Sequence, residues 1–225
     1  MKLLIISDIH SNFYALNLLL NKIKNIDKII CLGDITGYYC QVNETIELLR
    51  KNNVFCILGN HDYYLINGYT KQLPDAVKFG IEFAQKSITK DNLKWLSQLQ
   101  IMSGQIIDNK SVLMVHGSPW NPIKDYLYSD SNKLVNLYNF DFDIICFGQT
   151  HRSLYLFDKN KIILNPGSVG QSRDKINYVC AAVLDTISDV VERIEIKYNP
   201  NNIIDIAKKN GAGNWIYKHL EESSK

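Results

Sequence analysis

The residues of this chain that could do chemistry share one position, because each closely follows a short apolar run. They are two aspartates, one asparagine and four of the five histidines: Asp8, His10, Asp34, Asn60, His61, His116 and His151. Carboxylate, imidazole and amide groups together suit a divalent cation such as Mn²⁺, Fe²⁺ or Zn²⁺, whereas thiolates favour softer ions. A set of this size indicates two ions, which together can bind a phosphate and lower the pKa of a water between them.

Each of these residues also has a simpler explanation when taken alone. Asp8 and Asp34 could be turn carboxylates, Asn60 could cap a helix, and His116 or His151 could bond to nearby backbone. These explanations do not account for the whole set following strands. Since α/β folds gather their ligands beyond the carboxyl ends of strands, the set as a whole favours a metal site.

The elements that would position these residues follow from the hydrophobic pattern. Apolar, β-branched runs alternate with stretches of helical period, which is typical of strands covered by helices. In the first half we predict strands over 2–7, 28–32 and 54–58, helices over 13–26 and 41–51, and a mostly helical stretch over 63–99. In the second half we predict strands over 111–115, 144–147, 153–157, 161–164, 178–184 and 190–196. This pattern predicts two sheets that share one core.

Length and composition limit the remaining possibilities. A chain of 225 residues with 46% hydrophobic content and no linker predicts one domain over 1–225, with 199–225 packed as an appendage. The net charge of +2 is spread along the chain, which argues against a nucleic-acid partner. We interpret the five scattered cysteines as reduced core thiols, and we see no signal peptide and no membrane-length segment. A cytoplasmic protein that engages no membrane is expected, and its oligomeric state is left open.

The order of the motifs resembles the calcineurin-like metallophosphoesterase superfamily, and within it the small bacterial and archaeal phosphodiesterase branch. That family's pattern runs Asp-x-His, Gly-Asp, Gly-Asn-His-Asp/Glu, a lone His and then Gly-His-x-His, and it matches this chain between Asp8 and His151. Asn165-Pro166-Gly167-Ser168-Val169-Gly170 extends the resemblance to about residue 174. The resemblance implies an α/β fold, a four-layer αββα sandwich of two mixed β-sheets flanked by helices.

Carried over residue by residue, the resemblance implies two divalent metal ions, with Mn²⁺ favoured over Fe²⁺, Zn²⁺ and Ni²⁺. Asp8, His10 and His151 would hold the first ion, Asn60 and His116 would hold the second, and Asp34 would bridge the two. A water activated by the ions would attack the phosphorus of a small phosphate ester.

Further residues would act on the substrate. His61 would be the general acid and Asp62 would orient or charge it, although His61 could instead be a loop histidine bonded to Asp62. Arg173 and Asn60 would contact the substrate, and Arg152 is a second candidate for binding phosphate. Either arginine could instead be a solvated surface residue.

This chain departs from the family pattern at three places. Gln149 stands where the family has a histidine, so the second ion would at best gain a neutral amide oxygen and would bind more weakly. Ser11 replaces a glycine. Ile35-Thr36-Gly37-Tyr38-Tyr39 replaces the Val-Asp-Arg-Gly element of the protein serine/threonine phosphatases, which disfavours a protein substrate. Tyr38 and Tyr39 could line a substrate pocket or stack a base, with packing against a helix as the alternative.

We therefore predict a metal-dependent phosphoric ester hydrolase that acts on a phosphodiester, a nucleotide or a phosphomonoester. The alternative is a catalytically weakened metal-binding scaffold or regulatory protein of the same fold, which the superfamily's retromer subunit resembles. Gln149 is the residue that points toward a scaffold, whereas the presence of Asp34 and His61 favours the hydrolase. A third possibility is an enzyme whose second site fills only when Mn²⁺ is added.

Overall fold

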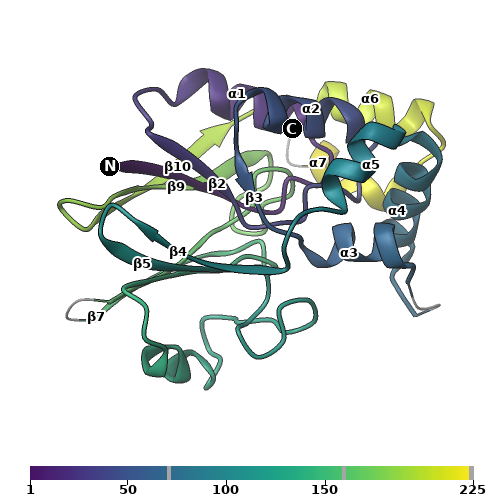
Figure 1. Ribbon diagram of the computed structural model, residues 1–225. Coiled ribbons are helices and arrows are strands. Elements are labelled where there is room, and N and C mark those ends of the chain that lie inside the picture. Colours follow the sequence, from purple (N-terminus) through teal and green to yellow (C-terminus); the bar gives the residue numbers. More distant parts are fainter. Residues whose placement is uncertain (70–71, 159–160, 223–225) are drawn as a thin grey trace.

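Two five-stranded sheets lie face to face in the computed structural model, which describes residues 1–69, 72–158 and 161–222 (Figure 1). The first sheet has the order β10-β9-β1-β2-β3, and the second has the order β4-β5-β6-β8-β7. The strands of the first sheet are β1 (Lys2–Ile6), β2 (Lys28–Cys31), β3 (Phe55–Cys56), β9 (Tyr178–Asp185) and β10 (Val190–Lys197). Those of the second sheet are β4 (Met102–Ile107), β5 (Lys110–Val115), β6 (Ile144–Cys146), β7 (Ser153–Asp158) and β8 (Lys161–Pro166). Both sheets are mixed, since each contains parallel and antiparallel pairs.

Helices cover the outer face of the first sheet (Figure 1). They are α1 (Phe13–Lys22), α2 (Val42–Lys51), α3 (Asn60–Asn67), α4 (Asp75–Ser87) and α5 (Lys90–Leu96). The Asn12 side chain accepts a hydrogen bond from the backbone N–H of Ala15 at 3.1 Å and thereby caps the start of α1. The helix ends earlier than we predicted, because Ile23 already has extended backbone angles.

The core lies on both faces of the first sheet. In β1, Leu3 and Ile5 face the second sheet, whereas Leu4 and Ile6 pack against the helices. Successive side chains of a strand point to opposite faces, so an apolar run that is buried throughout requires a layer on each side. The apolar pattern of residues 2–6 is therefore explained by the sandwich.

The outer face of the second sheet is covered by the long connection between β5 and β6. This connection carries the 3-10 helix η1 (Leu134–Asn139). Leu134 and Leu137 of η1 pack against Ile145 of β6 and Phe147, which follows β6. The predicted fold class, an α/β sandwich of two mixed sheets flanked by helices, is confirmed. Strand β4 was not predicted. It is an edge strand in which small and polar residues interrupt the apolar ones, so its hydrophobic pattern is weak.

The C-terminal segment packs on the helical layer at the top of Figure 1. It consists of α6 (Asn201–Lys209), the 3-10 helix η2 (Asn214–Ile216) and α7 (Lys218–Glu222). Ile203, Ile216 and Leu220 form a small core with Tyr39, and Phe79 of α4 packs against it.

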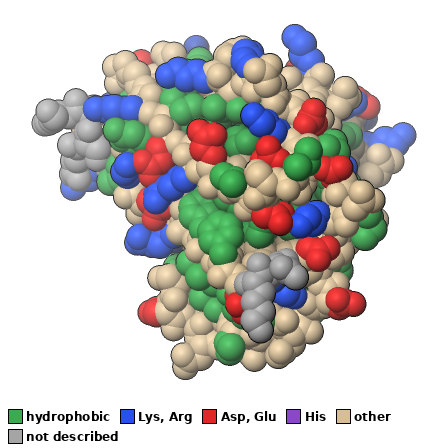
Figure 2. Space-filling model, turned by 90° about the vertical axis from the view of Figure 1, so that its left-hand side faces the viewer, with side chains coloured by type: hydrophobic (Ala, Val, Ile, Leu, Met, Phe, Trp, Pro, Cys, Tyr) green, Lys and Arg blue, Asp and Glu red, His purple; other side chains and the backbone are tan. Residues whose placement is uncertain are grey.

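Three further properties bear on function. Figure 2 shows the face at the amino end of β1, where hydrophobic side chains are scattered among charged ones and no histidine is visible. All five cysteines are free and buried. Within the described ranges, every helix is too short or too polar to cross a membrane.

Candidate metal centre

The turns that follow β1, β2, β5 and β6 meet at the opposite end of the sheets, and backbone hydrogen bonds join them. The N–H of Asp8 donates to the carbonyl of Gly33 at 3.0 Å, and that of His10 donates to the carbonyl of Asp34 at 2.9 Å. The N–H of Gly148 donates to the carbonyl of His116 at 2.8 Å. Side chains from distant parts of the sequence are thereby held at one place.

Many residues of these turns have a left-handed backbone, which non-glycine residues adopt at a cost. The residues with φ between +51° and +67° include Asp8, His10, Asp34, Gln149 and His151. Each such conformation costs on the order of 1 kcal/mol, and strain of this kind gathers at functional sites. The backbone is therefore shaped to aim these side chains rather than to minimise its own energy.

Four of the predicted ligands form one buried cluster. Asp8, His10, Asp34 and His151 offer ligand atoms that all lie within 4.8 Å of one another. His151 Nε2 lies 3.3 Å from Asp8 Oδ1, and His10 Nε2 lies 3.6 Å from Asp34 Oδ2. These four side chains could hold one divalent cation.

Two further predicted ligands adjoin the same carboxylate. His116 Nε2 lies 3.4 Å from Asp34 Oδ2 and 3.1 Å from Asn60 Oδ1. Asp34 Oδ2 thus stands between the imidazoles of His10 and His116. A carboxylate in this place is suited to contact two cations at once.

The hydrogen bonds of the imidazoles prepare their Nε2 atoms as ligands. Each Nδ1 bonds to a backbone carbonyl: His10 to Thr36 at 3.1 Å, His116 to Leu32 at 2.8 Å and His151 to Gln171 at 2.8 Å. Because a carbonyl only accepts, each Nδ1 must carry the hydrogen. Such a partner is typical of metal-binding histidines, since it fixes the tautomer that leaves Nε2 free.

The pair formed by His10 and His151 fits a cation in particular. Their Nε2 atoms are 3.0 Å apart. Burial lowers the pKa of His10, and burial together with the charge of Arg173 lowers the pKa of His151 to about 3, so both rings are neutral. The lone pairs of the two Nε2 atoms then face each other. Moving the hydrogen of either ring from Nδ1 to Nε2 would instead set an Nδ1 lone pair against a carbonyl oxygen. Asp8 Oδ1, which is also buried, has no hydrogen-bond partner among the described residues.

His116 and Asp34 are an oppositely charged pair. Burial alone would lower the pKa of His116, but the carboxylates of Asp34 and Asp8 raise it to about 10. Burial would raise the pKa of Asp34, but the imidazoles of His116 and His61 hold it below its usual range. The negative charge that holds the proton on His116 would also favour a cation at this position.

Gln149, the departure from the family pattern, lies at the edge of this cluster. Its backbone N–H donates to Asp8 Oδ2 at 3.1 Å, and its side-chain amide donates to the carbonyl of Ile123 at 3.2 Å. The buried Oε1 has no hydrogen-bond partner within the described ranges, and a Cβ on Gly117 would lie 2.6 Å from it. The free acceptor Oε1 thus lies next to Gly117, the residue that follows His116. The role of Gln149 as a metal ligand stays a prediction.

His61 lies at the cluster, in the first turn of α3 rather than in a loop. Its Nε2 is 3.8 Å from Asp34 Oδ2, and its ring stacks on Tyr38 with centroids 5.0 Å apart. Its Nδ1 has no hydrogen-bond partner among the described residues. Burial lowers the pKa of His61. The ring is therefore held by packing.

Asp62 does not make the contact that we expected with His61. Its carboxylate accepts four hydrogen bonds, from the backbone N–H groups of Ile35, Thr36 and Gly59 and from the Thr36 hydroxyl. The reason is that α3 begins at Asn60, which points Asp62 back at the start of its own helix and at the turn after β2. Asp62 joins the turn that carries Asp34 to the helix that carries Asn60 and His61.

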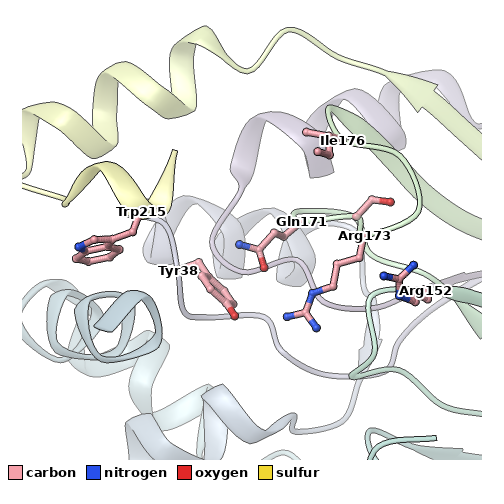
Figure 3. A pocket seen from close by; sticks show the side chains of 7 residues that line it. Tyr38, Arg152, Gln171, Arg173, Ile176 and Trp215 are labelled. Carbon is pink, nitrogen blue, oxygen red and sulfur yellow. The ribbon is translucent and has the colours of Figure 1, made fainter. Parts of the chain in front are cut away.

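The motif over 165–170 packs on the Asp8 turn and leads into Arg173. The Ser168 hydroxyl and the Gly170 N–H both donate to the carbonyl of Asp8, at 2.7 Å and 3.0 Å. The backbone N–H of Arg173 donates to the carbonyl of His151 at 3.1 Å. The Arg173 side chain then enters a cavity of about 440 Å³, which Arg152 also lines (Figure 3).

Sequence reasoning missed several residues around the site. Trp215 and Gln171 line the same cavity as Arg173. A second cavity of about 740 Å³ borders Gln149 and is lined by tyrosines that include Tyr64 and Tyr126. These residues belong to no motif, and no pattern in the sequence brings their distant segments to the site.

Comparison with known proteins decides the family. The model of the calcineurin-like phosphoesterase superfamily domain matches residues 1–189. The chain belongs to this superfamily. An uncharacterized protein of Methanocaldococcus jannaschii is 35% identical over 237 residues, which cover 96% of each protein. The crystal structure of a metallophosphoesterase from Sphaerobacter thermophilus superposes with a TM-score of 0.85 at 26% identity and covers 99% of both chains.

A more distant relative has a named activity. The symmetrical bis(5'-nucleosyl)-tetraphosphatase of Baumannia cicadellinicola is 28% identical over 125 residues, 52% of this chain and 43% of that protein. The resemblance seen in the motifs is confirmed. The calcineurin-like phosphoesterase superfamily, to which the chain belongs, is a family of metal-dependent phosphoesterases. The buried carboxylates and imidazoles of this chain are donors that fit divalent cations.

Proposed function

We propose that this chain is a metal-dependent phosphoric ester hydrolase that acts on a phosphodiester, a nucleotide or a phosphomonoester. The observation that supports it best is the position of Asp34 Oδ2, within 3.6 Å of His10 Nε2 and 3.4 Å of His116 Nε2. We assign one ion to Asp8, His10 and His151, a second to Asn60 and His116, and the bridging position to Asp34. Mn²⁺ is the ion that we favour. When bound, the ions would polarise the phosphate and lower the pKa of a water.

The protein's own residues then bind the ester and handle the proton. We assign to Arg173 the binding of a phosphate oxygen, and the extension of its guanidinium into the cavity supports this role (Figure 3). We assign to His61 the protonation of the leaving oxygen. Its ring is neutral in the free protein, and the negative charge of a bound phosphate favours the protonated form that donation requires.

A catalytically weakened scaffold is the second candidate, and Gln149 is the observation that favours it. A neutral amide contributes less to cation binding than the imidazole that the family pattern has at this position. Against the scaffold stand the left-handed backbone of Asp8, His10 and Asp34 and the burial of His61 beside them. A protein that did not use this geometry would gain stability by relaxing it.

We also propose where the protein is located and what it binds. We propose a cytoplasmic location, since free buried thiols are typical of reducing compartments. The partner that we propose is a small phosphate ester rather than a nucleic acid or a membrane.

The test is hydrolysis of bis-p-nitrophenyl phosphate and p-nitrophenyl phosphate by chelator-stripped protein during a titration with Mn²⁺. Asp34→Asn is the critical variant and Asp130→Asn, which changes an exposed carboxylate, is its matched control. We expect turnover that requires Mn²⁺, that Asp130→Asn retains and that Asp34→Asn loses. The faster of the two esters indicates whether diesters or monoesters are preferred. No turnover at any Mn²⁺ concentration would favour the scaffold.

A further inference from the structure

The 440 Å³ cavity shares a wall with the metal centre. That wall is Tyr38, whose ring meets the His10 ring edge-on with centroids 4.6 Å apart and stacks on His61. The volume lies within the range of small-molecule sites, about 300–1,000 Å³. The cavity therefore adjoins the cluster, with Tyr38 between the two.

One end of the cavity is basic. The Arg173 guanidinium lies beside the Tyr38 hydroxyl, and Arg152 lies on the side of Arg173 that faces away from Tyr38 (Figure 3). Arg152 has Asp174 at 4.0 Å, whereas Arg173 forms no ion pair with any carboxylate of the described residues. A guanidinium that has no carboxylate partner is suited to a phosphate oxygen.

The other end of the cavity is aromatic. Trp215, which is 44% exposed, lines it beyond Tyr38, whereas Ile176 lies on the side of Arg173 (Figure 3). The indole is nevertheless held in place, because it packs edge-on against Phe79 at 5.9 Å and lies over Gly213, where a Cβ would be 2.3 Å from the ring. A fixed, half-exposed indole in the same cavity as Tyr38 offers a surface on which a flat ring can stack.

The C-terminal segment supplies this aromatic end. It lies beyond residues 1–189, the part that the family model matches. Its core side chains pack around Tyr39, and the Asn177 side chain donates to the carbonyl of Leu220 at 3.0 Å, which ties the segment to the loop that carries Ile176. The segment thus completes the cavity without contributing any of the proposed metal ligands.

We propose that this cavity is a nucleoside subsite: the substrate is a nucleoside phosphate ester whose base stacks on Trp215 while its phosphate lies between Arg173 and the metal centre. This proposal rests on the hydrolase function proposed above. Stacking of a base on an aromatic side chain changes affinity by roughly 5- to 150-fold when that side chain is replaced by alanine. Trp215 is then the residue that distinguishes a nucleoside ester from a simple alkyl ester.

The experiment compares two esters with the same leaving group, the p-nitrophenyl ester of thymidine 5'-monophosphate and methyl p-nitrophenyl phosphate. If the protein cleaves monoesters only, adenosine 5'-monophosphate and methyl phosphate replace them, with phosphate release as the readout. We expect Trp215→Ala to raise KM for the nucleoside ester roughly 5- to 150-fold and to leave the methyl ester unchanged, with Trp215→Phe close to wild type. Arg173→Ala is expected to weaken both esters. Equal effects of Trp215→Ala on the two esters, or no effect, would overturn the subsite.

A binding measurement separates this proposal from the proposed function. Adenosine 5'-monophosphate added to metal-free protein is expected to quench tryptophan fluorescence, and Trp215→Phe is expected to abolish the quenching although Trp95 and Trp120 remain. Quenching without turnover would retain the subsite and reject the hydrolase. Turnover of the methyl ester without quenching or any preference for the nucleoside ester would retain the hydrolase and reject the subsite.

Discussion

Replacing Gly37 with alanine is expected to disable His61 without changing any proposed ligand. Gly37 has φ of +98°, and a Cβ at this residue would lie 2.1 Å from His61 Nδ1. Ordinary contact begins at 3.4 Å, so the ring has to move by about 1.3 Å. A misplacement of about 1 Å in a catalytic group can cost on the order of 10² in rate. The left-handed backbone adds about 1–2 kcal/mol of strain, which lowers stability rather than the rate.

The expected rate loss depends on the leaving group. A general acid contributes about 10²–10⁴-fold when the leaving oxygen needs a proton, as in an alkyl ester. A p-nitrophenolate is stable as an anion and gains little from protonation. Gly37→Ala should therefore slow an alkyl phosphate ester about 10²-fold and slow a p-nitrophenyl ester far less.

The assay measures kcat for both esters together with bound Mn²⁺ per chain. His61→Ala should reproduce the pattern, with its metal content intact. Gly211→Ala is the matched control, because Gly211 has φ of +78° but a Cβ there would meet no described atom within 4 Å, so this variant carries the strain without the clash. Equal slowing of both esters, loss of Mn²⁺, or a profile like that of Gly211→Ala would refute the reasoning.

Three further predictions concern the centre itself. The pKa of His116 is raised to about 10, whereas a cation needs the neutral ring. Binding of Mn²⁺ near pH 8 should therefore release about one proton from His116, and the affinity for Mn²⁺ should rise with pH. Calorimetry in two buffers of different ionisation enthalpy measures this release, and equal binding enthalpies in the two buffers would contradict it. Gln149→His should lower the Mn²⁺ concentration that half-restores activity, and an unchanged value would mean that Gln149 does not face the ion. Asp62→Asn should lower the free energy of unfolding by roughly 2–4 kcal/mol, because an amide NH₂ would face N–H donors; urea denaturation measures this, and a change below about 1 kcal/mol would contradict it.

The sequence was most informative where chemistry and strand ends coincide. Asp8, Asp34 and His116 could be identified as candidate ligands because each follows a buried strand, and parallel strands deliver their carboxyl ends to one edge. Two sheets flanked by helices followed from the alternation of apolar runs with stretches of helical period. These inferences required only local patterns.

The sequence was least informative where the geometry depends on where an element begins. Asp62 was expected to orient His61, but the start of α3 at Asn60 turns its carboxylate toward backbone N–H groups instead. Most of the chain separates Trp215 from Tyr38 in the sequence. The two line one cavity because α6 and α7 pack on Tyr39. Contacts of this kind come from packing between distant segments, which no local pattern encodes.

The central claim is that the cluster around Asp34 is a catalytic centre for two ions. The most direct test follows hydrolysis of p-nitrophenyl esters while the Mn²⁺ bound per chain is measured by equilibrium dialysis. We predict that turnover appears as the second ion binds and that Asp34→Asn neither binds two ions nor turns over. Full turnover without bound metal, or two bound ions without turnover, would contradict the claim.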